Sequence, residues 1–321
     1  MKIVILDAKT LGGDMEFSAI ERLGDVSVYQ TTSHLQLEER IRDAEIIVVN
    51  KIKLGKDNLP AAKKLKLICV TATGFDNIDI NYCWSNQIGV CNVKAYSTDS
   101  VAQLTVTMAL SLVTHLGEFD SYVKSRRYTE SGVANRLKPY FHEIKSLTWG
   151  IVGGGTIGGE VARIARALGC RVIIKPHKER EGYGFVTMEE LLKESDIISL
   201  HVPLTSETRG MINEKTIAKM KDGVVFINVS RGAVADEKAL CEAVIDGKLG
   251  GLGIDVYEKE PMSEDSPYSR ILNRKNVIFT PHMAWGAYES RVRCINEIAK
   301  NIETFIMGGK RNRVDLNRYS A

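Results

Sequence analysis

The 321-residue sequence lacks the features that mark several common classes of protein. Its six cysteines are scattered, and no two have the Cys-x-x-Cys spacing of a zinc or redox site, which favours reduced thiols. No apolar run is long enough to cross a membrane and no signal-peptide pattern is present, so we expect a soluble, cytoplasmic protein without a membrane partner. A formal net charge of +3 is too small to indicate a nucleic-acid partner. We predict no metal site.

The length is about twice that of a usual domain, and 44% of the residues are hydrophobic, so the chain can bury two cores. Strand-like apolar segments alternate with amphipathic helices in both halves, which predicts two doubly wound, parallel α/β sheets. The predicted strands are 3–6, 26–29, 46–49, 67–71, 89–92, 147–152, 170–174, 197–201, 224–229, 251–256 and 277–280. The predicted helices include 38–43, 78–85 and 289–307.

Between the two halves lies a segment that is apolar on nearly every side of a helix. We predict that it forms a helix over 101–116, with Asp99 and Ser100 as its N-cap. A helix of this composition is buried all round, in a domain or a subunit interface. The following segment, 126–140, is polar and is predicted to be irregular.

The most specific signal is the glycine pattern formed by Gly153, Gly155 and Gly158. An apolar strand precedes it, and an amphipathic helix and a second strand follow. In this context the first glycine allows a tight turn, the second lets a pyrophosphate approach the backbone, and the third lets the helix pack closely on the sheet. The pattern therefore predicts a Rossmann-type dinucleotide site, with the phosphates at the helix N-terminus. The alternative is an ordinary βαβ unit whose glycines serve packing alone.

Three chemically active residues follow successive predicted strands of the second half: Arg231, Glu260 and His282. Open α/β sheets bind ligands at the carboxyl ends of their strands. Taken singly, these residues have ordinary interpretations as a surface charge, a residue of a solvated turn and a structural histidine. Together, facing a nicotinamide, an arginine can bind a carboxylate through two hydrogen bonds, and a carboxylate can stabilise a protonated histidine that delivers a proton.

The sequence resembles the NAD(P)-dependent D-isomer-specific 2-hydroxyacid dehydrogenases. The resemblance covers essentially the whole chain, and residues 1–7, 96–103 and Trp285 are most similar to the glycerate dehydrogenase (hydroxypyruvate reductase) branch. It rests on the ordered motifs ATGFDNID at 72–79, VGGGTIG at 152–158, HVPLT at 201–205, NVSRG at 228–232 and TPHMAW at 280–285. It implies a flavodoxin-like substrate domain over 1–99 plus 290–321, a Rossmann domain over 100–289, and a homodimer formed largely by 101–116 and 126–140.

The resemblance also implies a role for each matching residue. Arg231 would bind the substrate carboxylate and polarise the keto oxygen, His282 would exchange a proton with that oxygen, and Glu260 would stabilise the imidazolium. Substrate would also meet the backbone N–H groups of Ala72, Thr73 and Gly74, with Phe75 and Trp285 limiting its size. Lys51 would add positive charge, although a plain surface lysine is an equal alternative. Cofactor contacts are expected from Gly153, Gly155, Thr156, Ile157, Gly158, His201, Val202, Pro203, Val229, Ser230 and Asp255.

The implied enzyme is an oxidoreductase acting on the CH–OH group of a small D-2-hydroxy acid, with hydroxypyruvate or glyoxylate as the keto acid. D-lactate, phosphoglycerate and phosphite dehydrogenases of the same fold remain alternatives. Formate enzymes carry Gln where this chain has Glu260, which counts against them. A dinucleotide-sensing corepressor-like regulator is the alternative from another class.

The end of the second Rossmann strand departs from the pattern of NAD enzymes. An acidic residue is expected there to bind the ribose 2′-hydroxyl, but Pro176 occupies the position. Lys175, His177 and Lys178 surround it instead, which predicts a 2′-phosphate pocket and a preference for NADP(H) over NAD(H). The alternative is a solvated basic turn in an NAD enzyme.

Overall fold

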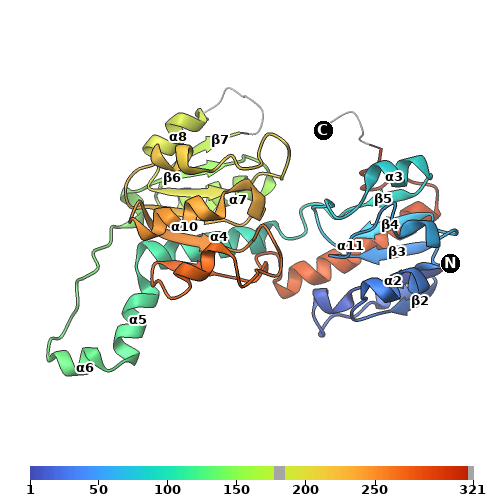
Figure 1. Ribbon diagram of the computed structural model, residues 1–321, viewed down its shortest axis with the longest axis horizontal. Helices are drawn as coiled ribbons and strands as arrows, with labels where there is room; N and C mark the ends of the chain where they lie inside the picture. Colours follow the sequence, from blue (N-terminus) through green and yellow to red (C-terminus); the bar gives the residue numbers. More distant parts are fainter. Residues whose placement is uncertain (177–184, 317–321) are drawn as a thin grey trace. The chain divides into compact units, whose positions relative to one another are not determined.

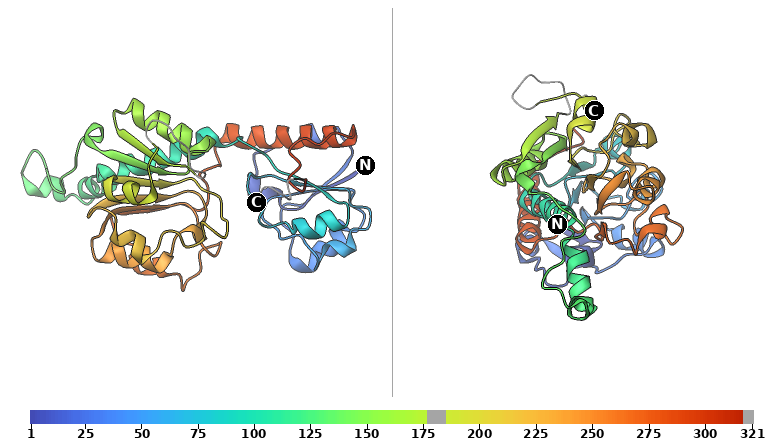
Figure 2. Two further views of the ribbon diagram at one scale, coloured as in Figure 1. Left: turned by 90° about the horizontal axis from the view of Figure 1, so that it is seen from above. Right: turned by 90° about the vertical axis from the view of Figure 1, so that its left-hand side faces the viewer.

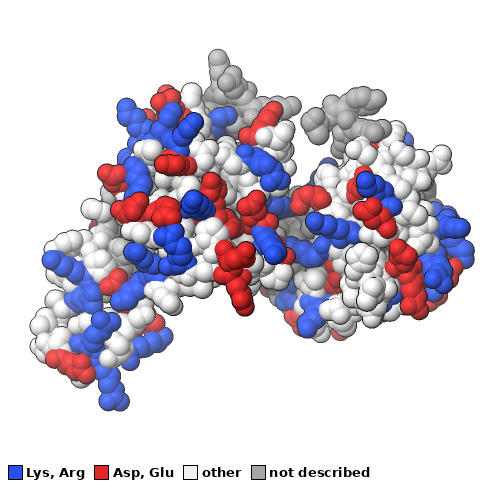
Figure 3. Space-filling view, in the orientation of Figure 1, with Lys and Arg blue, Asp and Glu red and all other residues white. Residues whose placement is uncertain are grey.

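The structure, a computed structural model, describes residues 1–176 and 185–316. The chain forms two compact units, of which unit 1 comprises Met1–Ser97 with Gly286–Ala321 and unit 2 comprises Thr98–Trp285. Figure 1 shows a sheet flanked by helices in each unit. On the face drawn in Figure 3, basic and acidic side chains are interspersed over both units, so the small net charge reflects a mixed surface there.

Unit 1 contains a five-stranded parallel sheet with the order β2-β1-β3-β4-β5. This is the flavodoxin-like strand order and confirms the predicted fold class for this unit. Its inner strands β3 and β4 are buried on both faces, which explains why they are continuous apolar runs. The strands are β1 (Lys2–Ile5), β2 (Asp25–Val28), β3 (Ile46–Val49), β4 (Leu67–Val70) and β5 (Gly89–Cys91).

Helices cover both faces of this sheet. Figure 2 shows α11 (Tyr288–Ile306) along one face, where it packs with α1 (Ser18–Glu21), and α2 (His34–Ile41) with α3 (Ile80–Ser85) on the other. The helix predicted at 38–43 begins earlier, because Ser33 and Gln36 form a capping box that the sequence analysis missed. The helix predicted at 78–85 begins two residues later, after Asp79 accepts a hydrogen bond from the Tyr82 N–H. Two short 3₁₀ helices, η1 (Ala8–Leu11) and η2 (Leu59–Ala61), complete the elements named in this unit.

Unit 2 contains a six-stranded parallel sheet with the order β11-β10-β9-β8-β6-β7. Phe185 adds an isolated parallel bridge to Ile174 at the β7 edge. With Phe185 counted as a third strand, the order from that edge is 3-2-1-4-5-6-7, which extends the Rossmann order and confirms the second predicted fold. The strands are β6 (Thr148–Val152), β7 (Arg171–Lys175), β8 (Ile197–Leu200), β9 (Val224–Asn228), β10 (Leu249–Ile254) and β11 (Val277–Phe279).

Most of the helices of unit 2 connect these strands. They are α7 (Thr156–Ala167), α8 (Met188–Glu194), α9 (Glu214–Ala218) and α10 (Glu237–Ile245), with 3₁₀ helices η4 (Gly232–Val234) and η5 (Pro267–Ile271), while η3 (Ile144–Ser146) precedes β6. The chain leaves β6 for β7 on one side and returns to β8 on the other, so β6 and β8 flank the point where such sheets bind ligands.

The apolar helix predicted at 101–116 differs in two ways. It is α4 (Thr98–Val113), so Asp99 and Ser100 lie in its first turn rather than at an N-cap, and the Ser100 hydroxyl donates to the Ala284 carbonyl (2.6 Å). Within a single chain Gln103 and Thr107 of this helix are exposed, so burial on every side would require the subunit interface. The helix ends before His115, whose positive φ of 51° turns the chain into the next helix.

Residues 116–141, which follow α4, form an arm. It contains α5 (Leu116–Lys124) and α6 (Arg127–Ser131), so the irregular structure predicted for 126–140 is wrong where α6 forms. Figure 1 shows α5 and α6 projecting away from the sheet of unit 2. Among the described residues no single helix is long and apolar enough to span a membrane. Helices α4 and α5, which are bent by 63° relative to each other, reach that length and composition only as a pair.

Candidate active site

The glycine loop between β6 and α7 has the geometry of a phosphate cradle. Gly153 has φ +103°, and a Cβ there would lie 2.4 Å from the His201 carbonyl oxygen. A Cβ on Gly158 would lie 1.9 Å from the Gly153 carbonyl oxygen, so the fold itself requires both glycines. A Cβ on Gly155 would meet nothing within 4 Å, which leaves open space directly over the N-cap of α7. The N–H groups of Thr156 and Ile157 begin that helix, so the residues present fit a dinucleotide pyrophosphate.

His201 follows β8 beside this loop and is held as a neutral side chain. Its Nε2 lies 2.9 Å from the Ser199 hydroxyl, which also accepts a hydrogen bond from the Trp149 indole (3.0 Å). The indole can only donate to this hydroxyl, and the oxygen has a second lone pair as well as its own proton, so either neutral tautomer of His201 can complete the contact. Burial lowers the pKa of His201 to about 3, so this ring is uncharged at neutral pH.

His282 and Glu260 form a pair at the carboxyl edge of the unit 2 sheet. His282 Nδ1 lies 2.6 Å from Glu260 Oε2, and the two side chains are 22% and 31% exposed. The carboxylate fixes Nδ1 as a donor, so Nε2 is the nitrogen whose protonation can change. The other carboxylate oxygen of Glu260 accepts the Tyr257 N–H (3.2 Å), which orients it further.

The backbone of His282 is held in an uncommon conformation. Its φ is +51°, and its N–H donates to the carbonyls of Asp255 (2.8 Å) and Thr280 (3.0 Å). The indole N–H of Trp285 donates to the His282 carbonyl (2.9 Å), so a residue predicted to limit substrate size also supports this turn. Such a conformation persists only where the surroundings determine it, and here three hydrogen bonds do so.

Asp255, predicted to bind cofactor, holds the turn that carries His282. One of its carboxylate oxygens accepts the Met283 N–H (2.9 Å) and the Thr280 hydroxyl (2.5 Å), and the other accepts the Ala284 N–H (3.0 Å). The side chain is buried, and burial raises the pKa of Asp255, although these hydrogen bonds oppose that rise. A cofactor role for Asp255 stays a prediction.

Arg231 follows β9, the strand next to β10. Its Nη1 donates to the Ser230 carbonyl (2.8 Å), and the Asn228 amide donates to the Arg231 carbonyl (2.9 Å). A Cβ on Gly232 would lie 2.0 Å from the Tyr257 carbonyl carbon. That close approach brings the Arg231 turn against the chain that leads to Glu260. The structure therefore gathers the three predicted catalytic residues on the neighbouring strand ends of β9, β10 and β11.

Glu237 is a supporting residue that the sequence analysis missed. Its buried carboxylate accepts the Glu258 N–H (2.8 Å) and the Ser266 hydroxyl (3.2 Å), and so anchors the segment that carries Glu260. Both partners lie more than 20 residues away in the sequence. Local patterns carry no signal for such bonds.

Unit 1 places its predicted substrate residues after the neighbouring strands β3 and β4. The Lys51 N–H donates to the buried Asp7 carboxylate (2.7 Å), and burial raises the pKa of Asp7 against its backbone hydrogen bonds. After β4, the Thr73 hydroxyl donates to the carbonyl of Val93 (2.8 Å), in the chain that leaves β5, and Phe75 packs against the core.

The residues predicted to select the cofactor are only partly described. Lys175 ends β7, and its ammonium donates to the Pro176 carbonyl (2.8 Å). His177 and Lys178 lie outside the described residues. Val202, Pro203, Val229 and Ser230 follow β8 and β9, and their predicted cofactor contacts stay predictions.

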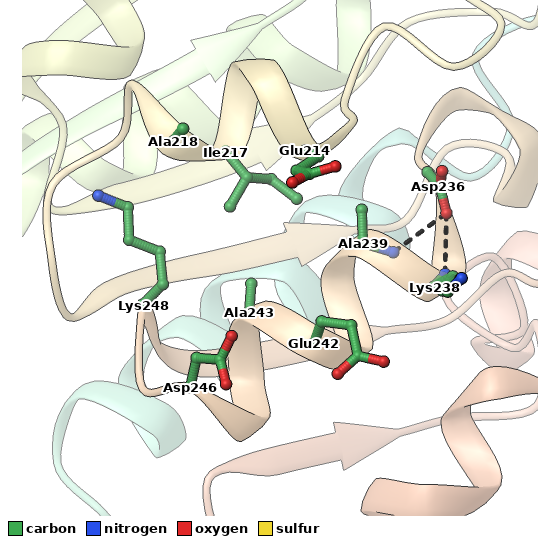
Figure 4. Close-up of a pocket in the computed structure, with 10 residues that line it drawn as sticks. All are labelled: Glu214, Ile217, Ala218, Asp236, Lys238, Ala239, Glu242, Ala243, Asp246 and Lys248. Atoms are coloured by element: carbon green, nitrogen blue, oxygen red, sulfur yellow. Dashed lines mark hydrogen bonds between the residues drawn. The ribbon is translucent and has the colours of Figure 1, made fainter.

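A separate pocket of about 760 Å³ lies between α9 and α10 (Figure 4). Its walls carry the carboxylates of Glu214, Glu242 and Asp246, while Asp236 caps α10 by accepting the N–H groups of Lys238 and Ala239. None of the predicted site residues lines it. It therefore takes no part in the chemistry considered above.

Comparison with known proteins identifies the family. The family model described as "D-isomer specific 2-hydroxyacid dehydrogenase, NAD binding domain" matches residues 106–284. A hydroxypyruvate reductase of Blautia hydrogenotrophica is 37% identical, covering 98% of this chain and 100% of that protein. A glyoxylate reductase of Thermococcus litoralis is 38% identical over 85% of this chain and 83% of that protein. Among solved structures, a D-lactate dehydrogenase of Aquifex aeolicus, complexed with NAD and lactic acid, has a TM-score of 0.85 and 34% identity, covering 96% of each chain.

Proposed function

The chain belongs to the D-isomer-specific 2-hydroxyacid dehydrogenase family, and we propose that it reversibly reduces hydroxypyruvate or glyoxylate to the D-2-hydroxy acid. The observation that carries this proposal is the His282–Glu260 pair at the same sheet edge as Arg231, in the unit that also holds the Gly155 cradle. We assign the loop at Ala72–Gly74, which contacts substrate, to unit 1, and the cofactor cradle with Arg231, Glu260 and His282 to unit 2.

The residues act in complementary ways. A bound nicotinamide supplies the hydride that reduces the keto carbon. Arg231 binds the substrate carboxylate and draws electron density toward the keto oxygen. His282 Nε2 donates its proton to that oxygen as it becomes a hydroxyl, and Glu260 stabilises the protonated ring beforehand. In the oxidative direction His282 takes the proton back.

A panel of 2-keto acids, each measured with NADH and with NADPH, tests the function. If Phe75 and Trp285 limit the size of the substrate, hydroxypyruvate and glyoxylate should have higher kcat/KM than phenylpyruvate and 2-ketoisocaproate. Pyruvate tests the second candidate, a D-lactate dehydrogenase, which the Aquifex aeolicus structure favours. Absence of turnover with every acid, together with dinucleotide binding, would indicate a regulator instead. Equal kcat/KM across the panel would contradict the size limit.

We also propose a preference for NADPH over NADH. No carboxylate occupies 170–178 to repel a 2′-phosphate, and Lys175 lies at the end of β7. One charge-assisted hydrogen bond contributes about 1.5–3 kcal/mol, or roughly tenfold or more in affinity. Lys175→Ala combined with Lys178→Ala should therefore raise the Kd for NADPH about tenfold more than that for NADH.

Fluorescence titration measures both dissociation constants of the wild type and the variant. Lys193→Ala, an exposed lysine of α8, is the matched control and should change neither constant. Equal losses for the two cofactors, or a wild type that prefers NADH, would show that the basic turn is merely solvated.

The arm supports a homodimer in solution. It exposes a series of large apolar side chains, and such a surface on a monomer favours aggregation. They are Leu116, Val123, Tyr128, Val133, Leu137, Tyr140 and Phe141, and Leu137 and Tyr140 are 73% and 71% exposed. Light scattering should give about twice the 35.6 kDa of one chain.

Leu137→Glu with Tyr140→Glu should shift this mass toward the monomer, because the two charges would have to be buried in the interface. Leu35→Glu changes a side chain that is 94% exposed in unit 1 and should leave the mass unchanged. A monomeric wild type at micromolar concentration would refute the dimer. A cytoplasmic location stays a prediction.

A further inference from the structure

The loop after β4 has its carbonyl groups held on one side. The Ala72 carbonyl accepts the Val93 N–H (3.0 Å), and the Thr73 carbonyl accepts the side-chain amide of Asn92 (2.7 Å). Both donors belong to the chain that leaves β5. The cis peptide bonds of the described residues lie elsewhere, so these two peptides are trans. In a trans peptide the C=O and N–H point in opposite directions, so the N–H groups of Thr73 and Gly74 face away from β5.

The N–H groups of Thr73 and Gly74 are left to donate to a ligand. Within residues 1–176 and 185–316 neither has a hydrogen-bond acceptor in the protein. Successive backbone N–H groups that face the same way make a concave site for a carboxylate. The direction of the Gly74 N–H depends on the bond that Asn92 makes to the carbonyl of the same peptide.

The backbone of Asn92 is held by Asn301 and Asn312. Its N–H donates to the Asn312 carbonyl (3.2 Å), and its carbonyl accepts the side-chain amide of Asn301 on α11 (2.9 Å). The Asn312 amide in turn donates to the Asn301 side-chain oxygen (3.0 Å). Asn92 and Asn301 are both buried, so this network is held within the core of unit 1.

The side-chain oxygen of Asn92, Oδ1, is buried and accepts no hydrogen bond among the described residues. A buried acceptor without a partner costs free energy, so an apolar side chain would serve packing better. What an asparagine provides at this position is its amide N–H, which bonds to the substrate loop.

We propose that Asn92 is a positioning residue for substrate binding, which holds the Thr73–Gly74 peptide so that its N–H donates to the substrate carboxylate. The inference rests on the proposed function, because it takes the substrate to be a 2-keto acid. Asn92 follows β5, which lies two strands along the sheet from β3 and Lys51. Asn301 of α11 supports the Thr73–Gly74 peptide indirectly, through its hydrogen bond to the Asn92 carbonyl.

Steady-state kinetics with hydroxypyruvate and glyoxylate test the proposal. Asn92→Ala should raise KM about tenfold, with a smaller change in kcat, because the lost contact is made in both the ground state and the transition state. The Kd for NADPH should stay within about twofold of the wild type, since the cofactor cradle lies in the other unit. Asn301→Ala should raise KM less, because it acts through the Asn92 backbone.

Asn92→Asp gives a readout that a general loss of stability cannot. The variant keeps the shape of the side chain, so it also carries the test if Asn92→Ala does not fold. At neutral pH its carboxylate would repel the Thr73 carbonyl, and KM should exceed that of Asn92→Ala. At lower pH the protonated carboxyl can donate to that carbonyl, so the ratio of its KM to the wild-type KM should fall as the pH falls.

Cys83→Ala is the control for destabilisation, because Cys83 is fully buried on α3 in the same unit. A KM of Asn92→Ala equal to that of Cys83→Ala, or an Asn92→Asp ratio that does not change with pH, would overturn the inference while an active wild type upholds the proposed function. A wild type that reduces no 2-keto acid would overturn both.

Discussion

Replacing His282 by alanine should lower kcat for 2-keto acid reduction by roughly 10²–10⁴-fold, the usual contribution of a positioned general acid. The Kd for NADPH should change little, because the cradle at Gly155 does not depend on this ring. Stopped-flow and steady-state rates with hydroxypyruvate measure the loss. His34→Ala, at an exposed position of α2, should retain wild-type rates. Unchanged turnover in His282→Ala would refute the assignment of the acid.

Replacing the partner of His282 should also slow reduction. The Glu260 carboxylate lies 2.6 Å from His282 Nδ1 and stabilises the positive charge of the protonated imidazole. Glu260→Gln keeps a hydrogen-bond acceptor beside Nδ1 but removes the negative charge, so kcat for reduction should fall by roughly tenfold or more. The Kd for NADPH should change little, and steady-state rates with hydroxypyruvate measure the loss. An unchanged kcat would contradict the role of Glu260.

Arg231→Ala should have the other large effect, a loss of roughly 10²-fold or more in kcat/KM. Two charge-assisted hydrogen bonds to the carboxylate would be lost, each contributing about 1.5–3 kcal/mol. Both KM and kcat should change, because the same guanidinium binds the carboxylate and polarises the keto oxygen.

Arg231→Lys should restore only part of the activity, since an ammonium cannot make the planar, two-bond contact. Arg166→Ala, an exposed arginine of α7, is the matched control and should leave kcat/KM unchanged. Full activity in Arg231→Lys would show that charge alone suffices at this position.

The strand positions and the glycine turn could be predicted from the sequence, because each depends on residues that are close together in the chain. Alternating apolar segments placed the strands within one or two residues at most positions, since a strand buried on both faces must be apolar throughout. The spacing of Gly153, Gly155 and Gly158 predicted the turn, and a Cβ at the first or third position would clash with backbone. The alignment of Arg231, Glu260 and His282 followed from parallel topology, because the strand ends of β9, β10 and β11 meet at one edge.

What local patterns could not supply are the bonds that aim these side chains. Asp255 holds the His282 turn across 25 to 29 residues, Glu237 holds the Glu260 segment, and Asn92 holds the Thr73 carbonyl. The bend at His115 likewise has no signal in the apolar pattern of α4. The amino-acid order thus determined the strands, the glycine turn and the edge of the unit 2 sheet that carries Arg231, Glu260 and His282. The donor that each carboxylate or carbonyl meets depends on distances between segments that are remote in the chain, and these distances exist only once both sheets have folded.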